Sequence, residues 1–261
     1  MRLSTTALLC IGTGVAIVLT VLLVNSTNTS VQGYEADTDS PSSSFYSQDR
    51  QDEFLERELF RGFKNGFFVD VGAHDGVSLN NTLYFEKKKG WTGINIEPNP
   101  SVFTKLVKNR PRCINLSLAV SDKEGTATFM IQTGADMLSG LQATYDQRHL
   151  ERIQRENSLR NGSTQEHTAQ TRRLSTIFKD HKVKRVHYLS IDVEGGEKEV
   201  IQSIDFDGVF IDVIGFENNY ADVSAPIQQY LESRGYHRFL TPDAPTYDIF
   251  MVHRQSPFYR R

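Results

Sequence analysis

Acidic side chains stand where apolar runs end, and their positions indicate a ligand-binding crevice. The run "FFVDV" leads into a loop that holds Asp75, "TGINIE" ends at Glu97, and "YLSID" ends at Asp192. The other polar residues at such ends are Asp70, Ser121, Asp122, Glu194 and Glu217. If these runs are strands of one parallel sheet, their carboxyl ends share an edge, where open α/β sheets bind ligands. A crevice with this charge would repel a phosphate and suit a cation.

The glycine loop after the first run narrows the choice of ligand. Asp70, Gly72 and Gly76 form the pattern D-x-G-x-x-x-G, which has neither the G-x-G-x-x-G spacing of dinucleotide-binding proteins nor the G-K-[ST] of a P-loop. Glu97 lies about twenty residues past the loop, where a carboxylate can bind ribose hydroxyls. S-adenosylmethionine fits, since it has a sulfonium, an ammonium and a ribose but no phosphate. Alternatively, Asp70 and Asp192 only cap the helices that follow them.

An alternation of strands and helices must position these residues. The expected strands are 67–71, 92–97, 113–120, 185–192 and 211–217, and the expected helices are 52–60, 79–89, 99–110, 196–204 and 225–235. Two further strands, 236–241 and 247–253, have no room for a helix between them, so they should pair antiparallel. This order predicts an α/β fold with a mostly parallel sheet, helices on both faces and a terminal antiparallel strand pair.

Residues 132–173 interrupt this rhythm and are predicted to be an insertion, because such a length is too great for a simple loop. A helix within it places Tyr145, His149, Arg152 and Glu156 on one face. That face is either solvated or lies over the crevice. The end of the insertion, 157–170, is predicted to be mobile.

The N-terminal part predicts a membrane anchor. Residues 7–24 carry no charge and follow Arg2, so 1–24 indicate a short tail and a transmembrane signal-anchor with the rest of the chain luminal or extracellular. A cleaved signal peptide, giving a secreted protein, is the alternative. Residues 25–50 resemble a flexible stalk, and 51–261 the globular domain. Sequons at Asn25 and Asn28 favour a glycoprotein of the endoplasmic reticulum or Golgi.

Composition excludes other classes. The 261 residues include 29 basic and 32 acidic ones, and no basic block indicates nucleic-acid binding. Two cysteines cannot build a disulfide framework. No His/Cys cluster has metal-ligand spacing, so no metal site is predicted.

The motifs D-V-G-A-x-x-G, I-E-P-N-P, A-V-S-D and I-D-V-E-G-x-E occur in the order found in FkbM methyltransferases, and residues 67–131 and 174–253 resemble that family. The resemblance implies a class I, Rossmann-like fold with a seven-stranded sheet and S-adenosylmethionine as cofactor. It implies that the residues near the cofactor are Asp70, Gly72, Ala73, Asp75, Gly76, Glu97, Ser121, Asp122 and Asp192. Many members carry Lys where this chain has Ser190, and some carry His where it has Asn218, so the resemblance assigns no general base.

The function expected from these features is S-adenosylmethionine-dependent O-methylation of a carbohydrate or small metabolite at a membrane. A hydroxyl acceptor would need a base near the methyl group. The candidates are Asp192, Glu194, Glu217 and His149. Glu194 is alternatively a helix N-terminal acid. The layout is also similar to that of a Star-like membrane protein without catalysis, acting on protein cargo in the trafficking of signalling ligands.

Overall fold

The computed structural model describes residues 45–218 and 220–260. The predicted anchor at 7–24 and most of the predicted stalk lie outside these residues. Within the described part of the chain, no helix combines the length and apolarity that a membrane span requires. Residues 45–50 contact the domain: the Phe45 ring centroid is 4.5 Å from that of Tyr84, and Ser47 Oγ donates a 2.6 Å hydrogen bond to Asp52 Oδ1.

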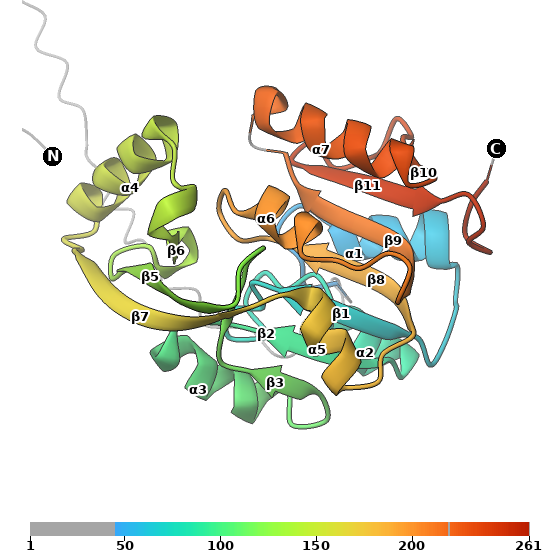
Figure 1. Ribbon diagram of the computed structural model, residues 1–261, viewed down its shortest axis with the longest axis horizontal. Coiled ribbons are helices and arrows are strands. Elements are labelled where there is room, and N and C mark those ends of the chain that lie inside the picture. The colour runs from blue at the N-terminus through green and yellow to red at the C-terminus, as the bar shows by residue number, and fades with distance from the viewer. Residues whose placement is uncertain (1–44, 219, 261) are drawn as a thin grey trace, which may run out of the picture. The chain divides into compact units, whose positions relative to one another are not determined.

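Seven strands form the main sheet, in the order β10-β11-β9-β8-β1-β2-β3 (Figure 1). The strands are β1 (Phe67–Val71), β2 (Thr92–Ile96), β3 (Ile114–Leu116), β8 (Arg185–Ile191), β9 (Phe210–Glu217), β10 (Tyr236–Phe239) and β11 (Asp248–His253). The first five run parallel, while β11 is antiparallel to both of its neighbours. The predicted mostly parallel sheet and its terminal antiparallel pair are confirmed.

Helices cover both faces of this sheet because its strands carry apolar residues on both sides. Aliphatic residues such as Val69 and Ile191 pack on one face against α5 (Leu174–Asp180), α6 (Glu197–Gln202) and α7 (Ala221–Ser233). Aromatic residues dominate the other face, where Phe68 and Tyr188 belong to the cluster that includes α2 and the N-terminal helix. The elements there are α1 (Gln51–Phe54), the π-helical η1 (Leu55–Phe60) and α2 (Leu83–Lys89), and α3 (Pro100–Asn109) follows β2.

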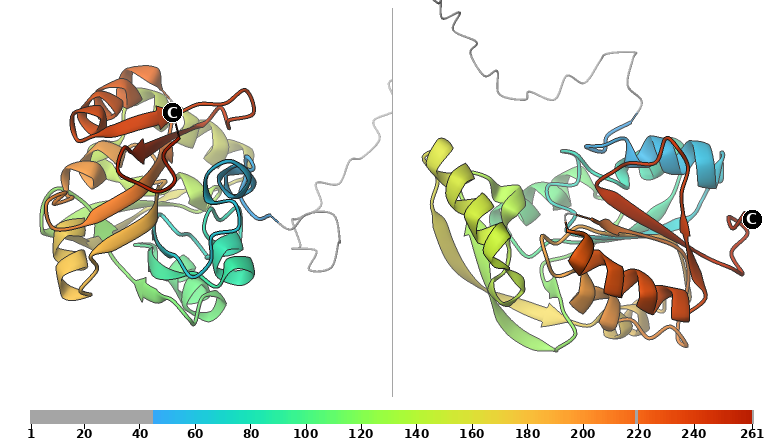
Figure 2. Two further views of the ribbon diagram at one scale, coloured as in Figure 1. Left: turned by 90° about the vertical axis from the view of Figure 1, so that its right-hand side faces the viewer. Right: turned by 90° about the horizontal axis from the view of Figure 1, so that it is seen from above.

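A second sheet has the strand order β4-β7-β5-β6, with β4 (Ala119–Val120), β7 (Thr164–Arg172), β5 (Gly125–Gln132) and β6 (Gly140–Leu141). The predicted insertion at 132–173 supplies β6, β7 and one helix, whereas β4 and nearly all of β5 precede it. The predicted strand 113–120 therefore divides between two sheets. The predicted mobility of 157–170 is wrong, because β7 pairs with β5 over eight residues from Gly125 to Gln132. Two short turns, η2 (Asp136–Leu138) and η3 (Gln142–Thr144), precede α4 (Gln147–Leu159), which stands to one side of the main sheet in two views (Figures 1 and 2).

Candidate functional site

The glycine loop lies between the ends of β2 and β8. The backbone N–H of Gly72 donates to the carbonyl of Ile96 over 3.0 Å, and Gly72 has a φ of +89°. A Cβ at this position would stand 1.7 Å from the carbonyl oxygen of Asp192. Only glycine can therefore occupy the position, since it tolerates this φ and leaves room for the neighbouring backbone. The contact with the cofactor predicted for Gly72 stays a prediction.

Asp70 faces a buried polar network behind the loop. Its carboxylate is 3% exposed and accepts hydrogen bonds from Asn80 Nδ2 (2.9 Å) and Thr82 Oγ1 (2.8 Å). Arg110 donates to both of these partners and pairs with Glu86. Burial raises the pKa of Asp70, and the Arg110 charge opposes that effect. Asp70 thus anchors the segment that follows the loop. Asn80 begins an Asn-x-Thr sequon, and the same network encloses its side chain.

Glu97 closes the loop from the β2 side. Its Oε2 accepts the backbone N–H of His74 (3.1 Å), and its Oε1 accepts that of Asn99 (2.8 Å). Burial raises the pKa of Glu97 to about 7, against the effect of these hydrogen bonds. Each oxygen keeps a lone pair. The carboxylate is therefore fixed next to the loop with free acceptor capacity, and its predicted contact with ribose hydroxyls stays a prediction.

A histidine in the loop connects it to the insertion. His74 Nε2 lies 3.3 Å from Asp136 Oδ2, and Nδ1 lies 3.7 Å from Asp75 Oδ1. Burial alone would lower the pKa of His74, but the two carboxylates outweigh it and raise the pKa to about 9. Asp75 Oδ1 also accepts the backbone N–H groups of Val77 and Ser78. Asp75 therefore holds the shape of the loop, and its predicted contact with the cofactor stays a prediction.

Ser121 and Asp122 follow β4, at the boundary between the two sheets. The backbone N–H of Ser121 donates to the carbonyl of Arg172 over 3.1 Å, and Arg173 donates to the carbonyl of Asp122 over 2.6 Å. Both residues are half-buried. Ala73 and Gly76 complete the predicted cofactor set, and Gly76 lets the loop pass against the side chains of Leu106 and Arg110. The contact with the cofactor predicted for Ser121 and Asp122 stays a prediction.

Three predicted catalytic carboxylates meet at the ends of β8 and β9. One oxygen of each of Asp192, Glu194 and Glu217 lies within 4.8 Å of the others, a group of the kind that can hold a metal ion. The prediction of no metal site considered only His and Cys and overlooked this arrangement. Loss of water to the surrounding protein and the negative charges of Glu197 and Asp70 raise the pKa of Asp192 to about 6. Because the Asp192 side chain is exposed to solvent, repulsion between the carboxylates explains the raised pKa better than burial does.

Helix α4 reaches Glu194 from the insertion. His149 Nδ1 lies 3.5 Å and Arg152 Nη1 3.2 Å from Glu194 Oε2. His149 Nε2 faces the carbonyl of Leu138 at 3.3 Å. Burial and the negative charge of Asp192 raise the pKa of Glu194 to about 8, whereas burial lowers that of His149. The predicted helical stripe therefore lies over the crevice through His149 and Arg152. The helix begins only at Gln147, so Tyr145 is not part of it, and the Tyr145 hydroxyl instead donates to the carbonyl of Leu138 over 2.9 Å. Glu156, the last member of the stripe, pairs instead with Arg160.

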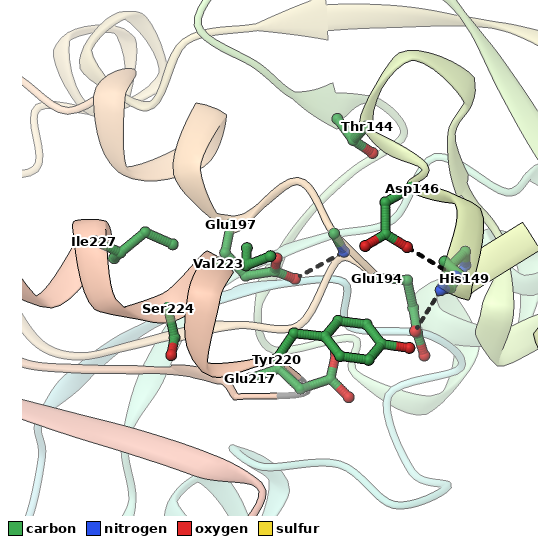
Figure 3. Close-up of a pocket in the computed structure, with 11 residues that line it drawn as sticks. Thr144, Asp146, His149, Glu194, Glu197, Glu217, Tyr220, Val223, Ser224 and Ile227 are labelled. Atoms are coloured by element: carbon green, nitrogen blue, oxygen red, sulfur yellow. Dashed lines mark hydrogen bonds and ion pairs between the residues drawn. The ribbon is translucent and has the colours of Figure 1, made fainter.

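A cavity of about 140 Å³ opens beside these groups (Figure 3). Its lining comes from α4 and the turn before it, from the turn between β8 and α6, and from the start of α7. The lining residues are Thr144, Asp146, His149, Glu194, Gly195, Glu197, Glu217, Tyr220, Val223, Ser224 and Ile227. The Tyr220 hydroxyl points toward Glu194 in Figure 3.

Sequence reasoning missed several lining residues. Asp146 has a recognisable signal: it stands three residues before His149 and accepts its backbone N–H as a helix cap. Glu197 lies next to the E-G-G pattern and accepts the backbone N–H of Gly195 over 3.1 Å. Nothing in the sequence marks Tyr220, because its role depends on where the insertion folds back.

The doubly wound sheet, the glycine loop and the acidic crevice at the strand ends define the class I methyltransferase fold. The residues fit S-adenosylmethionine, because the carboxylates at the strand ends suit a sulfonium and a ribose. Residues 70–238 match the Methyltransferase FkbM domain. The chain belongs to the FkbM family of S-adenosylmethionine-dependent methyltransferases.

Solved structures of methyltransferases show distant likeness. The FkbM methyltransferase from Methylobacillus flagellatus KT is 13% identical, with a TM-score of 0.43 over 73% of this chain and 44% of that chain. Aeropyrum pernix fibrillarin, in complex with natively bound S-adenosyl-L-methionine, is 12% identical, with a TM-score of 0.39 over 73% and 68%. This chain thus spans less than half of the first of them. No curated protein matches the sequence. With TM-scores this low, the assignment rests on the family match.

Proposed function

We propose that the protein transfers a methyl group from S-adenosylmethionine to a hydroxyl of a carbohydrate or small metabolite. The observation that carries the proposal is the meeting of the glycine loop, Glu97 and Asp192 at one edge of the sheet. Gly72 touches the backbone of Asp192 on one side and of Ile96 on the other. The cofactor seat therefore ends beside the carboxylate cluster, where a methyl acceptor would have to stand.

Bound S-adenosylmethionine would supply an activated methyl group. The protein's part is to hold the acceptor oxygen in line with it, to exclude water and to take up the hydroxyl proton. Glu194 and Asp192 suit the last task, because pKa values of about 8 and about 6 lie near neutral pH. His149 and Arg152 on α4 contact the Oε2 atom of Glu194, so they fix the orientation of this carboxylate.

Cofactor binding tests the proposal, with Glu97→Gln as the main variant. The glutamine keeps the size of the side chain but loses the charge that strengthens hydrogen bonds to ribose. We expect isothermal titration calorimetry with S-adenosylmethionine to show binding by the wild type and about 10- to 100-fold weaker binding by the variant. Glu124→Gln, on an exposed residue that follows Ser121 and Asp122, is the control. A folded wild-type chain without measurable binding would refute enzymatic function and favour the Star-like trafficking role.

The proposed setting is a membrane of the endoplasmic reticulum or Golgi, with the domain on the luminal side. Its support is the uncharged segment 7–24 behind Arg2 and the sequons at Asn25 and Asn28. Carbonate extraction should leave the protein in the membrane fraction, and a glycosidase should increase its gel mobility. Release into the supernatant would indicate a cleaved leader instead.

A further inference from the structure

Arg148 joins the two walls of the cavity beside Glu194. It lies on α4 and forms a bidentate ion pair with Asp222 at the start of α7. Its Nη1 and Nη2 atoms lie 3.0 and 3.2 Å from the two carboxylate oxygens. Its guanidinium carbon stands 3.7 Å from the ring centroid of Tyr220. It also contacts Asp146 Oδ2 at 2.6 Å. Tyr220 and Asp146 line the cavity on opposite sides, so a single side chain ties both sides together.

The ties made by Arg148 are of a kind that can open. Its side chain is 42% exposed and that of Asp222 is 69% exposed. Exposed ion pairs contribute little to stability and are weakened by salt. By contrast, the His149 and Glu194 side chains below it are less than a tenth exposed. The Arg148–Asp222 ion pair is therefore an exposed contact next to buried side chains, and it is not part of the hydrophobic core.

The interior selects by size and charge. A volume of about 140 Å³ is close to that of a cavity that holds one benzene-sized ring. Val223 and Ile227 provide apolar surface, whereas four lining residues are carboxylic acids and none is Lys or Arg. Ionised carboxylates only accept hydrogen bonds, whereas Glu194, with its pKa of about 8, is largely protonated at neutral pH and can also donate one. A ring-sized group that donates hydrogen bonds and carries no negative charge would fit, and an anion would be repelled.

We propose that this cavity is the acceptor-binding site and that Arg148 gates it, admitting a ring-sized hydrogen-bond donor and excluding anions. The proposal extends the function proposed above and rests on it, because only a methyltransferase would bind a methyl acceptor in this cavity. The gate and the charge selection are properties of the cavity itself, so they can be tested without knowing the acceptor and without measuring methyl transfer.

The test uses single cysteines in the full chain and two thiol reagents of similar size, one cationic and one anionic methanethiosulfonate. Ile227→Cys places the thiol in the cavity, and Ala225→Cys places one on the exposed side of α7 as the matched control. Peptide mapping by mass spectrometry separates their labelling from that of the native Cys10 and Cys113. The ratio of the two rates at one cysteine removes the effect of its thiolate fraction.

For each variant we compare the labelling rate of the cationic reagent with that of the anionic one. We expect this ratio to be at least about tenfold higher in Ile227→Cys than in Ala225→Cys. Adding Arg148→Met should raise both rates at 227 several-fold, whereas Arg155→Met on the same helix should not. Equal ratios at 227 and 225 would overturn the charge selection, and unchanged rates in Arg148→Met would overturn the gate. Calorimetry with S-adenosylmethionine on the same variants reports separately on the proposed function.

Discussion

Replacing Gly72 by alanine tests the contact on which the proposed cofactor seat depends. The new Cβ would meet the Asp192 carbonyl oxygen at 1.7 Å, so the loop or the end of β8 must move. Gly62 is a matched control, because its φ of +87° is nearly that of Gly72 while nothing lies within 4 Å of its Cβ. The two variants share the conformational cost of the left-handed region, about 1 kcal/mol. Only Gly72→Ala adds the steric cost.

The steric cost sets the size of the difference. Overpacking typically costs about 1–3 kcal/mol, and a backbone carbonyl yields less readily than a side chain, so we take about 3 kcal/mol. Gly72→Ala should then lose about 4 kcal/mol and Gly62→Ala about 1 kcal/mol. For a domain of this size these losses correspond to decreases in Tm of about 10 °C and about 3 °C.

Thermal unfolding followed by circular dichroism measures both variants under the same conditions. Calorimetry with S-adenosylmethionine on the folded fraction should show that Gly62→Ala binds as the wild type does and that Gly72→Ala does not. Equal losses of Tm in the two variants would refute the close approach of the loop to Asp192. That result would also refute the proposed position of the cofactor site.

Two further predictions concern buried charge and pH. Glu86→Gln should lower the free energy of unfolding in urea by about 3–5 kcal/mol, since it leaves the fully buried Arg110 without its anion; a loss no greater than that of Glu58→Gln, on a half-buried residue, would contradict this. The pKa of His74 is raised to about 9, so its contribution to stability is complete below pH 6.5 and is lost as the pH rises through 9. Between pH 6.5 and 9.5 the wild type should therefore lose up to about 3 kcal/mol more than His74→Asn, and parallel stability profiles would show that the pair with Asp136 contributes nothing.

The cofactor side of the site could be predicted from sequence because each of its parts follows directly from one strand. The glycine loop comes after β1, Glu97 after β2 and Asp192 after β8, so the alternation of elements was enough to bring them to one edge. What the sequence did not show is the direction of each side chain. Asp70 turns into the Asn80 and Thr82 network, a choice set by buried hydrogen bonds between residues ten and twelve positions apart.

The acceptor side could be predicted only in outline. The spacing on α4 placed His149 and Arg152 on one face, but not the partner of that face. Their contact with Glu194 joins positions about forty residues apart and depends on β7 pairing with β5. The polar composition of 157–170 indicated mobility, because strand β7 exposes much of its surface and gains its order from backbone pairing. Propensity alone does not contain that information.

The way the second sheet joins the first has a consequence for how this protein can change over time. The chain leaves the main sheet after β3 and returns to it at β8, and the elements between them are the second sheet, the turns η2 and η3, α4 and α5. Thr144, Asp146, Arg148 and His149 all lie in that single excursion. The excursion supplies Thr144, Asp146 and His149 to the cavity, whereas its other lining residues follow β8 or lie at and after the end of β9. If the cavity holds the methyl acceptor as proposed, an exchange of this one contiguous segment would change one wall of the acceptor site and leave Gly72 and Glu97 untouched.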